Sequence, residues 1–474
     1  MASRVTAPMR ACGVVMVACV AAGGCQSGYR SSARAIQAEL SRGDIPRAAE
    51  WANASFKGDA NDRDSVVRAL DAGSTLLLAG RAAESAAAFN AADEKVRPFL
   101  DEEAEVTISG NLGAVAVNQT VMTYKATPVE RTLLNTFGAV AHLTQGNMQE
   151  ARVQLNRAND WQRDAKDRYA RAMKRRQAKA SKDAAEKGID LERANRDGRL
   201  SALTQGLDDA QATAAFQSPF TSYLRATFLM GTSRETGDMG NARSELRSTW
   251  EMTSGPMRSV VERDIEQIDR GRIEPTTWIF VMTGLAPHRE EIRIDIPIPF
   301  GEVNYVSAAF PKLAYTEGNE TDYVVIAGGA TQPASLLMDV EKSVKAEFKE
   351  QLPAIITEEL VSSAVKAAAT YGASNIASGR DSRGNDWANL AIRVGGIIYQ
   401  AATTAADLRS WRALPRRILV ARVATPPDGV LTLQPGGGPV KSVTVEAGKF
   451  NGVLAWQSGA RGTPVSTIQW SMNP

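Results

Sequence analysis

The pattern of apolar and polar positions divides the chain into two halves. In the first half, four stretches share one spacing: a glycine, a small residue five positions later, and an apolar residue nine positions later. The last two positions lie on one face of a helix, where the small residue allows a neighbouring helix to approach closely. The glycine accepts the left-handed backbone geometry that ends a helix. Each stretch therefore predicts a helical hairpin. The stretches are residues 40–55, 77–93, 143–160 and 233–250, with the glycines Gly43, Gly80, Gly146 and Gly237.

The spacing of these hairpins indicates a repeat. Gly43 and Gly80 are 37 residues apart (80 − 43), and Gly80 and Gly146 are 66 apart (146 − 80). These intervals are close to one and two units of about 34 residues, the length of a tetratricopeptide unit. We expect a helical repeat domain over residues 31–262, with an irregular all-helical domain as the alternative. Within it, residues 157–199 are highly charged and predict a long solvated helix, whose basic cluster could instead contact anionic lipid or cell-wall polymer.

From residue 276 onward the pattern takes the spacing of strands. Residues 278–284 form a continuous apolar run, and residues 291–300 place an isoleucine at every second position. Further strands are predicted at 303–310, 322–327, 416–424, 429–433, 442–447, 452–457 and 466–472. Helices are expected from Asp339 to 352, from Pro353 to Tyr371 and from Trp387 to Thr404. The sequence thus predicts an α+β multidomain fold, in which the helical-hairpin repeats precede a mixed α+β domain at 276–474 with a mainly antiparallel sheet.

The N-terminal segment has the features of a bacterial lipoprotein signal. Arg4 and Arg10 precede an apolar run over residues 11–24, which is too short to cross a bilayer as a helix. Small residues lead directly to Cys25, whose thiol would receive the lipid. We expect residues 1–24 to be the signal peptide and 25–30 a lipidated tether, with an ordinary cleaved secretory signal as the alternative. By analogy with enteric sorting rules, the glutamine after the cysteine favours the outer membrane over the inner membrane.

Composition excludes several function classes. The three cysteines are Cys12, Cys19 and Cys25, so none follows the lipidation position and no disulfide framework, thiolate metal site or cysteine nucleophile is available. His142 and His288 are the only histidines, which leaves little for a zinc site or a catalytic triad. Removing the signal leaves a net charge of zero (55 − 2 − 53), which gives no electrostatic case for nucleic-acid binding. We expect no cofactor, no metal and no catalytic residues.

One polar motif remains as a candidate contact. Asp407, Arg409 and Trp411 lie at the junction between a predicted helix and a predicted strand. Arg409 can form a bidentate ion pair with a carboxylate, and Trp411 can anchor the segment in a core. A structural role is expected, with recognition of a ligand or a partner as the alternative. The glycine-rich segment 435–442 lacks the glycine and the following helix of a phosphate-binding loop, and it predicts a hairpin turn instead.

Three segments carry a resemblance to a known family. They are SPFTSYLRA (218–226), TGLAPHREEIRIDIPIP (283–299) and DLRSWRALPRRILVARV (407–423). Together with the lipoprotein signal and the helical repeats, they resemble a poorly characterised family of bacterial envelope lipoproteins with tetratricopeptide-like repeats. Members of that family are often encoded near lipoproteins similar to activators of penicillin-binding proteins. The resemblance implies a role in envelope assembly, and it implies no reaction and no catalytic residues.

These observations favour a non-catalytic lipoprotein of the outer membrane that faces the periplasm. We expect the repeats to offer a concave surface to a periplasmic or envelope protein, while the lipid on Cys25 binds the membrane. Two alternatives stay open at this point. The protein could be an enzyme that acts on cell-wall material through carboxylates that the sequence does not pair, or a structural subunit of an envelope complex.

Overall fold

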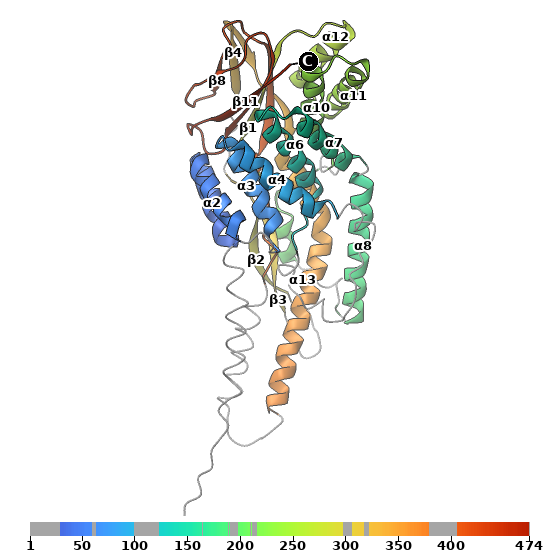
Figure 1. Ribbon diagram of the computed structural model, residues 1–474. Helices are drawn as coiled ribbons and strands as arrows, with labels where there is room; N and C mark the ends of the chain where they lie inside the picture. Colours follow the sequence, from blue (N-terminus) through green and yellow to red (C-terminus); the bar gives the residue numbers. More distant parts are fainter. Residues whose placement is uncertain are drawn as a thin grey trace, which may run out of the picture.

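The computed structural model describes residues 29–58, 63–98, 123–163, 165–187, 189, 198–208, 210, 216–296, 306–316, 322–378 and 405–473. The chain begins as an array of helices and continues into a domain of mostly antiparallel strands (Figure 1). A first helix covers residues 29–42. The helices that follow are α2 (Ile45–Gly58), α3 (Ser65–Leu78), α4 (Ala82–Val96), α6 (Pro128–Thr144), α7 (Met148–Gln162), α8 (Ala165–Glu186), the 3₁₀ helix η3 (Gly198–Leu203), α10 (Pro219–Thr232), α11 (Thr236–Met252) and α12 (Pro256–Asp269).

Adjacent helices pair as hairpins, and left-handed glycines form three of the turns. The φ angles of Gly43, Gly80 and Gly146 are 77°, 79° and 72°, the geometry that favours glycine. The assignment of Gly237 as a turn glycine is wrong, because Gly237 lies inside the first turn of α11. There the chain turns through Ser233 in an extended conformation, and the Ser233 hydroxyl accepts a hydrogen bond from the backbone N–H of Glu235. That turn needs no residue with positive φ.

The strands form three sheets. A five-stranded sheet has the order β11-β10-β1-β7-β6, in which β1 and β10 are parallel and the other pairs antiparallel. A four-stranded antiparallel sheet has the order β5-β4-β8-β9, and β2 and β3 form a separate hairpin. The strands are β1 (Thr276–Thr283), β2 (His288–Ile296), β3 (Val306–Ala314), β4 (Tyr323–Ala327), β5 (Ala330–Pro333), β6 (Ser335–Asp339), β7 (Arg417–Ala424), β8 (Val430–Pro435), β9 (Lys441–Thr444), β10 (Phe450–Gln457) and β11 (Ser466–Met472).

The five-stranded sheet is covered on both faces. Trp278 and Phe280 of β1 belong to the apolar core that the sheet shares with the helices, whereas Ile279 and Val281 belong to the core between the two larger sheets. Successive side chains of a strand point to opposite faces, so both sets are buried. This arrangement explains the continuous apolar run that predicted β1. It also joins the helices and the sheets through one core.

A second, smaller core lies under the β2–β3 hairpin. Residues of β2, β3 and η3 pack there against the helix α13 (Val340–Ser378), which also runs alongside α8. The expected break at Pro353 is wrong, because α13 continues through this proline. Phe348 and Leu352 on one side of Pro353 and Ile355 on the other are buried in the same core, which holds both halves of the helix on one axis. The helix expected at 387–404 lies outside the described residues.

Candidate functional site

The candidate residues Asp407, Arg409 and Trp411 lie in an irregular segment that joins the helical array to the sheet. We call residues 405–416 the strap. Trp411 is buried among the repeat helices, with ring centroids 6.2 Å from Phe89 and 6.0 Å from Phe137 in edge-on geometry. Its indole N–H donates to the Ser74 hydroxyl of α3 at 3.1 Å. The strap therefore occupies the inner side of α3, α4 and α6.

Two carboxylates from the helices bind the backbone of the strap. Asp71 of α3 accepts the backbone N–H groups of Arg412 and Ala413 at 2.8 and 3.1 Å. Glu130 of α6 accepts the backbone N–H of Trp411 at 3.1 Å. The same carboxylate accepts the backbone N–H of Thr127, and the Thr127 hydroxyl accepts the backbone N–H of Glu130, which together form the capping box at the start of α6. An irregular segment has no ladder to satisfy its backbone donors, so side chains must supply the acceptors.

Arg409 holds a buried ion-pair cluster at the start of the strap. Its guanidinium forms two parallel hydrogen bonds of 2.8 Å with the Asp407 carboxylate. It also donates to Asp64 at 3.3 Å and lies over the ring of Tyr124. Burial works against the charge of Asp407, but the bonds from Arg409 outweigh it and lower the pKa of Asp407 below its usual value. The cluster connects the strap with the loop before α3.

The first helix is fastened to the same strap. The Tyr29 hydroxyl donates to the backbone carbonyl of Ser410 at 3.1 Å, and Arg30 donates to the carbonyl of Ala406 at 3.2 Å. Arg412 donates to the side-chain oxygen of Gln37 at 2.7 Å. Both ends of the described chain segment 29–42 are thus linked to the C-terminal half, because Ser458 also donates to the carbonyl of Leu40 at 2.7 Å.

The inner side of the helical hairpins, where the sequence predicts a concave binding surface, is covered by the protein itself. The strap fills the inner side of α3, α4 and α6, and α3, α6 and α10 also contact β11 of the five-stranded sheet. In the described residues, a partner therefore has no access to this inner side. The sequence pattern of a repeat does not reveal what lies against it.

A small cavity remains between the strap, α6 and α13. It measures about 30 Å³, and its lining combines apolar side chains such as Phe348 with the polar Glu130, Arg289 and Glu347. Burial raises the pKa of Glu347 to about 8, although the backbone N–H of Val129 donates to it at 2.7 Å. A space of this size holds one or two water molecules. A sugar ring does not fit in a space of this volume.

The buried Asp71 gives a testable dependence of stability on pH. Burial raises its pKa from 3.8 to about 7, and its second carboxylate oxygen has no partner among the described residues. Between those two values the folded state keeps a proton that the unfolded chain has released, so stability falls as pH rises, by about 1.4 kcal/mol per unit for one proton. We expect Asp71→Asn to be more stable than the wild type at pH 8, because an amide cannot ionise and its oxygen can accept the same two N–H bonds.

The measurement is the urea midpoint of both proteins from pH 4 to pH 8. At pH 4 the two midpoints should be close, and they should separate as the pH rises to 7. Equal midpoints at every pH would show that Asp71 ionises alike in the folded and unfolded chains.

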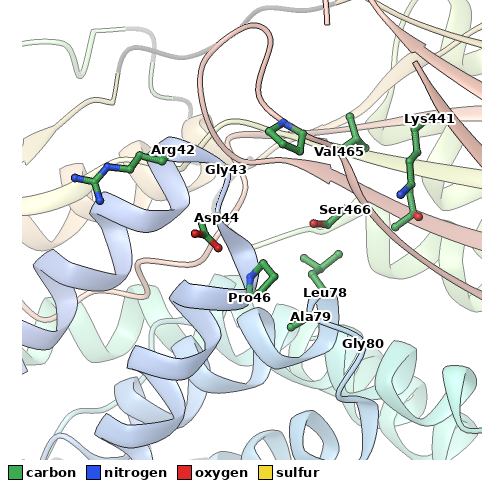
Figure 2. A pocket seen from close by; sticks show the side chains of 12 residues that line it. Arg42, Gly43, Asp44, Pro46, Leu78, Ala79, Gly80, Lys441, Val465 and Ser466 are labelled. Atoms are coloured by element: carbon green, nitrogen blue, oxygen red, sulfur yellow. The ribbon is translucent and has the colours of Figure 1, made fainter. Parts of the chain in front are cut away.

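An open groove lies at the turn edge of the repeats. It has a volume of about 640 Å³ and runs between the turns at Gly43 and Gly80 and the segment that begins β11 (Figure 2). β11 is the edge strand of the five-stranded sheet, and β9, which contributes Lys441, is an edge strand of the four-stranded sheet. The remaining lining residues are Arg42, Asp44, Pro46, Leu78, Ala79, Pro464, Val465, Ser466 and Thr467.

The two histidines and the glycine-rich segment 435–442 have roles in the fold. His142 is buried in the last turn of α6, and burial lowers its pKa. His288 begins β2, lies 3.1 Å from the Gln37 amide, and has a pKa lowered to about 4 by burial and by Arg412. Residues 435–442 span the end of β8, a turn and the start of β9, as predicted.

Among the residues that the structure covers, no group of three or more His, Cys, Asp or Glu side chains is placed to hold a metal ion. No helix in the described part of the chain has the length and hydropathy needed to cross a membrane.

Comparison with models of protein families, with curated proteins and with solved structures gives no match. The resemblance to envelope lipoproteins therefore stays a prediction.

Proposed function

We propose that this protein is a non-catalytic, lipid-anchored scaffold of the bacterial cell envelope. In this proposal Cys25 carries the lipid, the outer membrane holds the protein on its periplasmic side, and the helical hairpins are tetratricopeptide-like repeats. The signal pattern before Cys25 supports the anchor. The shared core between helices and sheets supports a rigid body, which is what a scaffold needs to hold a partner in a fixed position.

The observation that carries the proposal is the groove at the Gly43 and Gly80 turns, which stays open while the strap and sheet cover the inner side of the repeats. Two sheet edges, β9 and β11, contribute to its wall. Edge strands have backbone groups that can pair with an added strand. We propose that the groove binds an extended segment of an envelope protein, whose backbone pairs with one of these edges. The polar and charged lining favours a segment of mixed polarity.

The groove can be tested by blocking it. The double variant Ala79→Arg and Ser466→Arg places two long side chains at opposite walls of the groove (Figure 2). We expect a photo-crosslinker at position 441 to capture a reproducible partner in living cells, and the double variant to reduce its recovery at least about tenfold, the equivalent of 1.4 kcal/mol in affinity. Mass spectrometry of the purified adduct identifies the partner.

The matched control is Ser244→Arg, which adds the same side chain at an exposed position of α11. This variant should recover the partner as the wild type does. Undiminished recovery by the double variant would contradict the groove as the docking site. Release of fragments from isolated cell walls by the purified protein would contradict the non-catalytic part of the proposal.

A further inference from the structure

The folded body starts very close to the proposed lipid. Tyr29, only four residues after Cys25, is already buried and hydrogen-bonded to the strap. Four residues of extended chain span at most about 14 Å. An acylated Cys25 therefore brings the start of the first helix to within that distance of the bilayer surface. A protein on so short a tether is held close to its membrane.

Helix α13 extends past its neighbours toward this same end of the molecule. It has 39 residues, a length of about 58 Å at 1.5 Å per residue. Its last residue in the apolar core with β2, β3 and η3 is Ala364, which leaves 14 residues (365–378), or about 21 Å of helix, beyond that core. Figure 1 shows the end of α13, in orange, projecting below α8, below the β2–β3 hairpin and below the dark-blue helices at the start of the described chain. This length of helix beyond the core exceeds the reach of the tether.

The composition of this end suits a bilayer interface. Residues 367–378 contain no Asp, Glu, Lys or Arg. Beside the tether, the first helix carries the exposed Arg34 and has no acidic residue before Glu39, whereas Arg30 is already paired with Glu291 and the carbonyl of Ala406. Basic residues near the surface favour anionic headgroups, and a segment of about a dozen uncharged residues is short for a span but suitable for the interface.

We propose that residues 367–378 of α13 form a second membrane contact, which lies in the interface of the bilayer that holds the acyl chains of Cys25. This inference rests on the lipid anchor of the proposed function. Once the lipid is inserted, the helix end is held near the bilayer at a high effective concentration, so even a weak contact is populated.

The lipid on Cys25 and the contact by α13 together fix the orientation of the body. The lipid alone does not fix it. The turn at Gly43 lies at the other end of the first helix from Tyr29, about 21 Å away along residues 29–42. With α13 directed into the bilayer interface, the groove faces away from the membrane toward the periplasm. The second contact thus keeps the groove accessible to a partner.

A fluorescent label can report the contact directly. The full-length acylated protein carries Ala373→Cys, labelled with an environment-sensitive dye, and is reconstituted in vesicles of phosphatidylethanolamine and phosphatidylglycerol. The mature chain has no cysteine after Cys25, and the thiol of acylated Cys25 is blocked, so the label is unique. We expect the emission to rise severalfold and to shift to the blue, and nitroxide lipids to quench it. The control label at Lys441→Cys, in the groove, should show neither change.

Two further readouts separate the inference from the anchor. Mass spectrometry of the N-terminal peptide shows whether Cys25 is acylated. An acylated protein whose label at position 373 behaves like the label at position 441 would overturn the second contact and leave the scaffold proposal standing. A protein that the cell does not acylate would overturn the anchor, and with it the premise of this inference. In acylated protein, Ala368→Asp and Ala373→Asp together should shift the helix end into water, detected with the dye at Ser378→Cys as a loss of quenching.

Discussion

Trp411→Ala is expected to lower the free energy of unfolding by about 3–5 kcal/mol, the cost typical of removing a large aromatic side chain from a core. Trp411 is 2% exposed and contacts Phe89 and Phe137 edge-on. Its loss also removes the hydrogen bond to the Ser74 hydroxyl, which is buried. The effect should appear as a lower urea midpoint with an unchanged slope, because both proteins expose similar surface on unfolding.

The chain offers a matched control for this experiment. Trp51 is 46% exposed on α2, so Trp51→Ala removes the same side chain from a partly solvated position. We expect it to cost clearly less than Trp411→Ala. Trp411→Phe should fall between the two, since it keeps an aromatic ring but not the indole donor. Equal losses for Trp51→Ala and Trp411→Ala would show that the strap contributes no more than a surface contact.

The spacing of hydrophobic residues predicted the strands whose side chains are buried in a regular pattern. The continuous apolar run of β1 is buried throughout, and in β2 the isoleucines Ile294 and Ile296 are buried while Ile292 is half-buried. Strands β5 and β6 were missed, because β5 contains a proline and polar residues and β6 runs directly into α13 at Asp339. Gly328 and Gly329 precede β5 with positive φ and are a hairpin signal that could have located it. The unbroken course of α13 depends on tertiary packing, which a local rule for proline does not include.

The sequence predicted only part of the candidate site. Asp407 and Arg409 are two residues apart, and their pairing follows from that proximity. Their other partners are distant: Asp64 lies 345 residues before Arg409, and Asp71 lies 341 before Arg412. Such pairs depend on how the C-terminal half returns to the repeats, and no local pattern specifies that path. An acid at a core position of an otherwise apolar helix, such as Asp71, is the signal that could have marked the contact.

The strap also changes how the helical hairpins are understood. Helical repeats present an inner surface that commonly binds other chains. Here the chain's own strap occupies that surface with backbone N–H groups bound to carboxylates and with an aromatic anchor. The repeats and the C-terminal strands therefore stabilise each other, and a fragment that ends before residue 405 would expose Phe89 and Phe137 to water. Deletion experiments would then lose the fold together with any binding, so substitutions in the groove are the better test.

Arg409→Met is the second substitution with a large expected effect. It keeps a side chain of similar length but removes the charge that compensates the buried Asp64 and the mostly buried Asp407, whose side chain is 13% exposed. Removing one partner of a buried ion pair typically costs 3–5 kcal/mol, because an uncompensated charge stays in a poorly solvated site. We expect a loss of about that size at pH 7, measured by urea unfolding. Arg409→Lys should also lose stability, because an ammonium group cannot form the two parallel bonds to Asp407.

A further variant shows whether the lower stability of Arg409→Met comes from lost charge compensation or from lost packing. Adding Asp407→Leu to Arg409→Met removes both charges of the closest pair, so the double variant should be more stable than Arg409→Met alone. Arg270→Met is the surface control: its pair with Glu266 is well exposed, and it should cost no more than about 1 kcal/mol. If the double variant were no more stable than Arg409→Met, the loss would come from packing and the carboxylate of Asp407 would not need the guanidinium. If the double variant is instead more stable than Arg409→Met, charge compensation is what holds the strap against the helical hairpins.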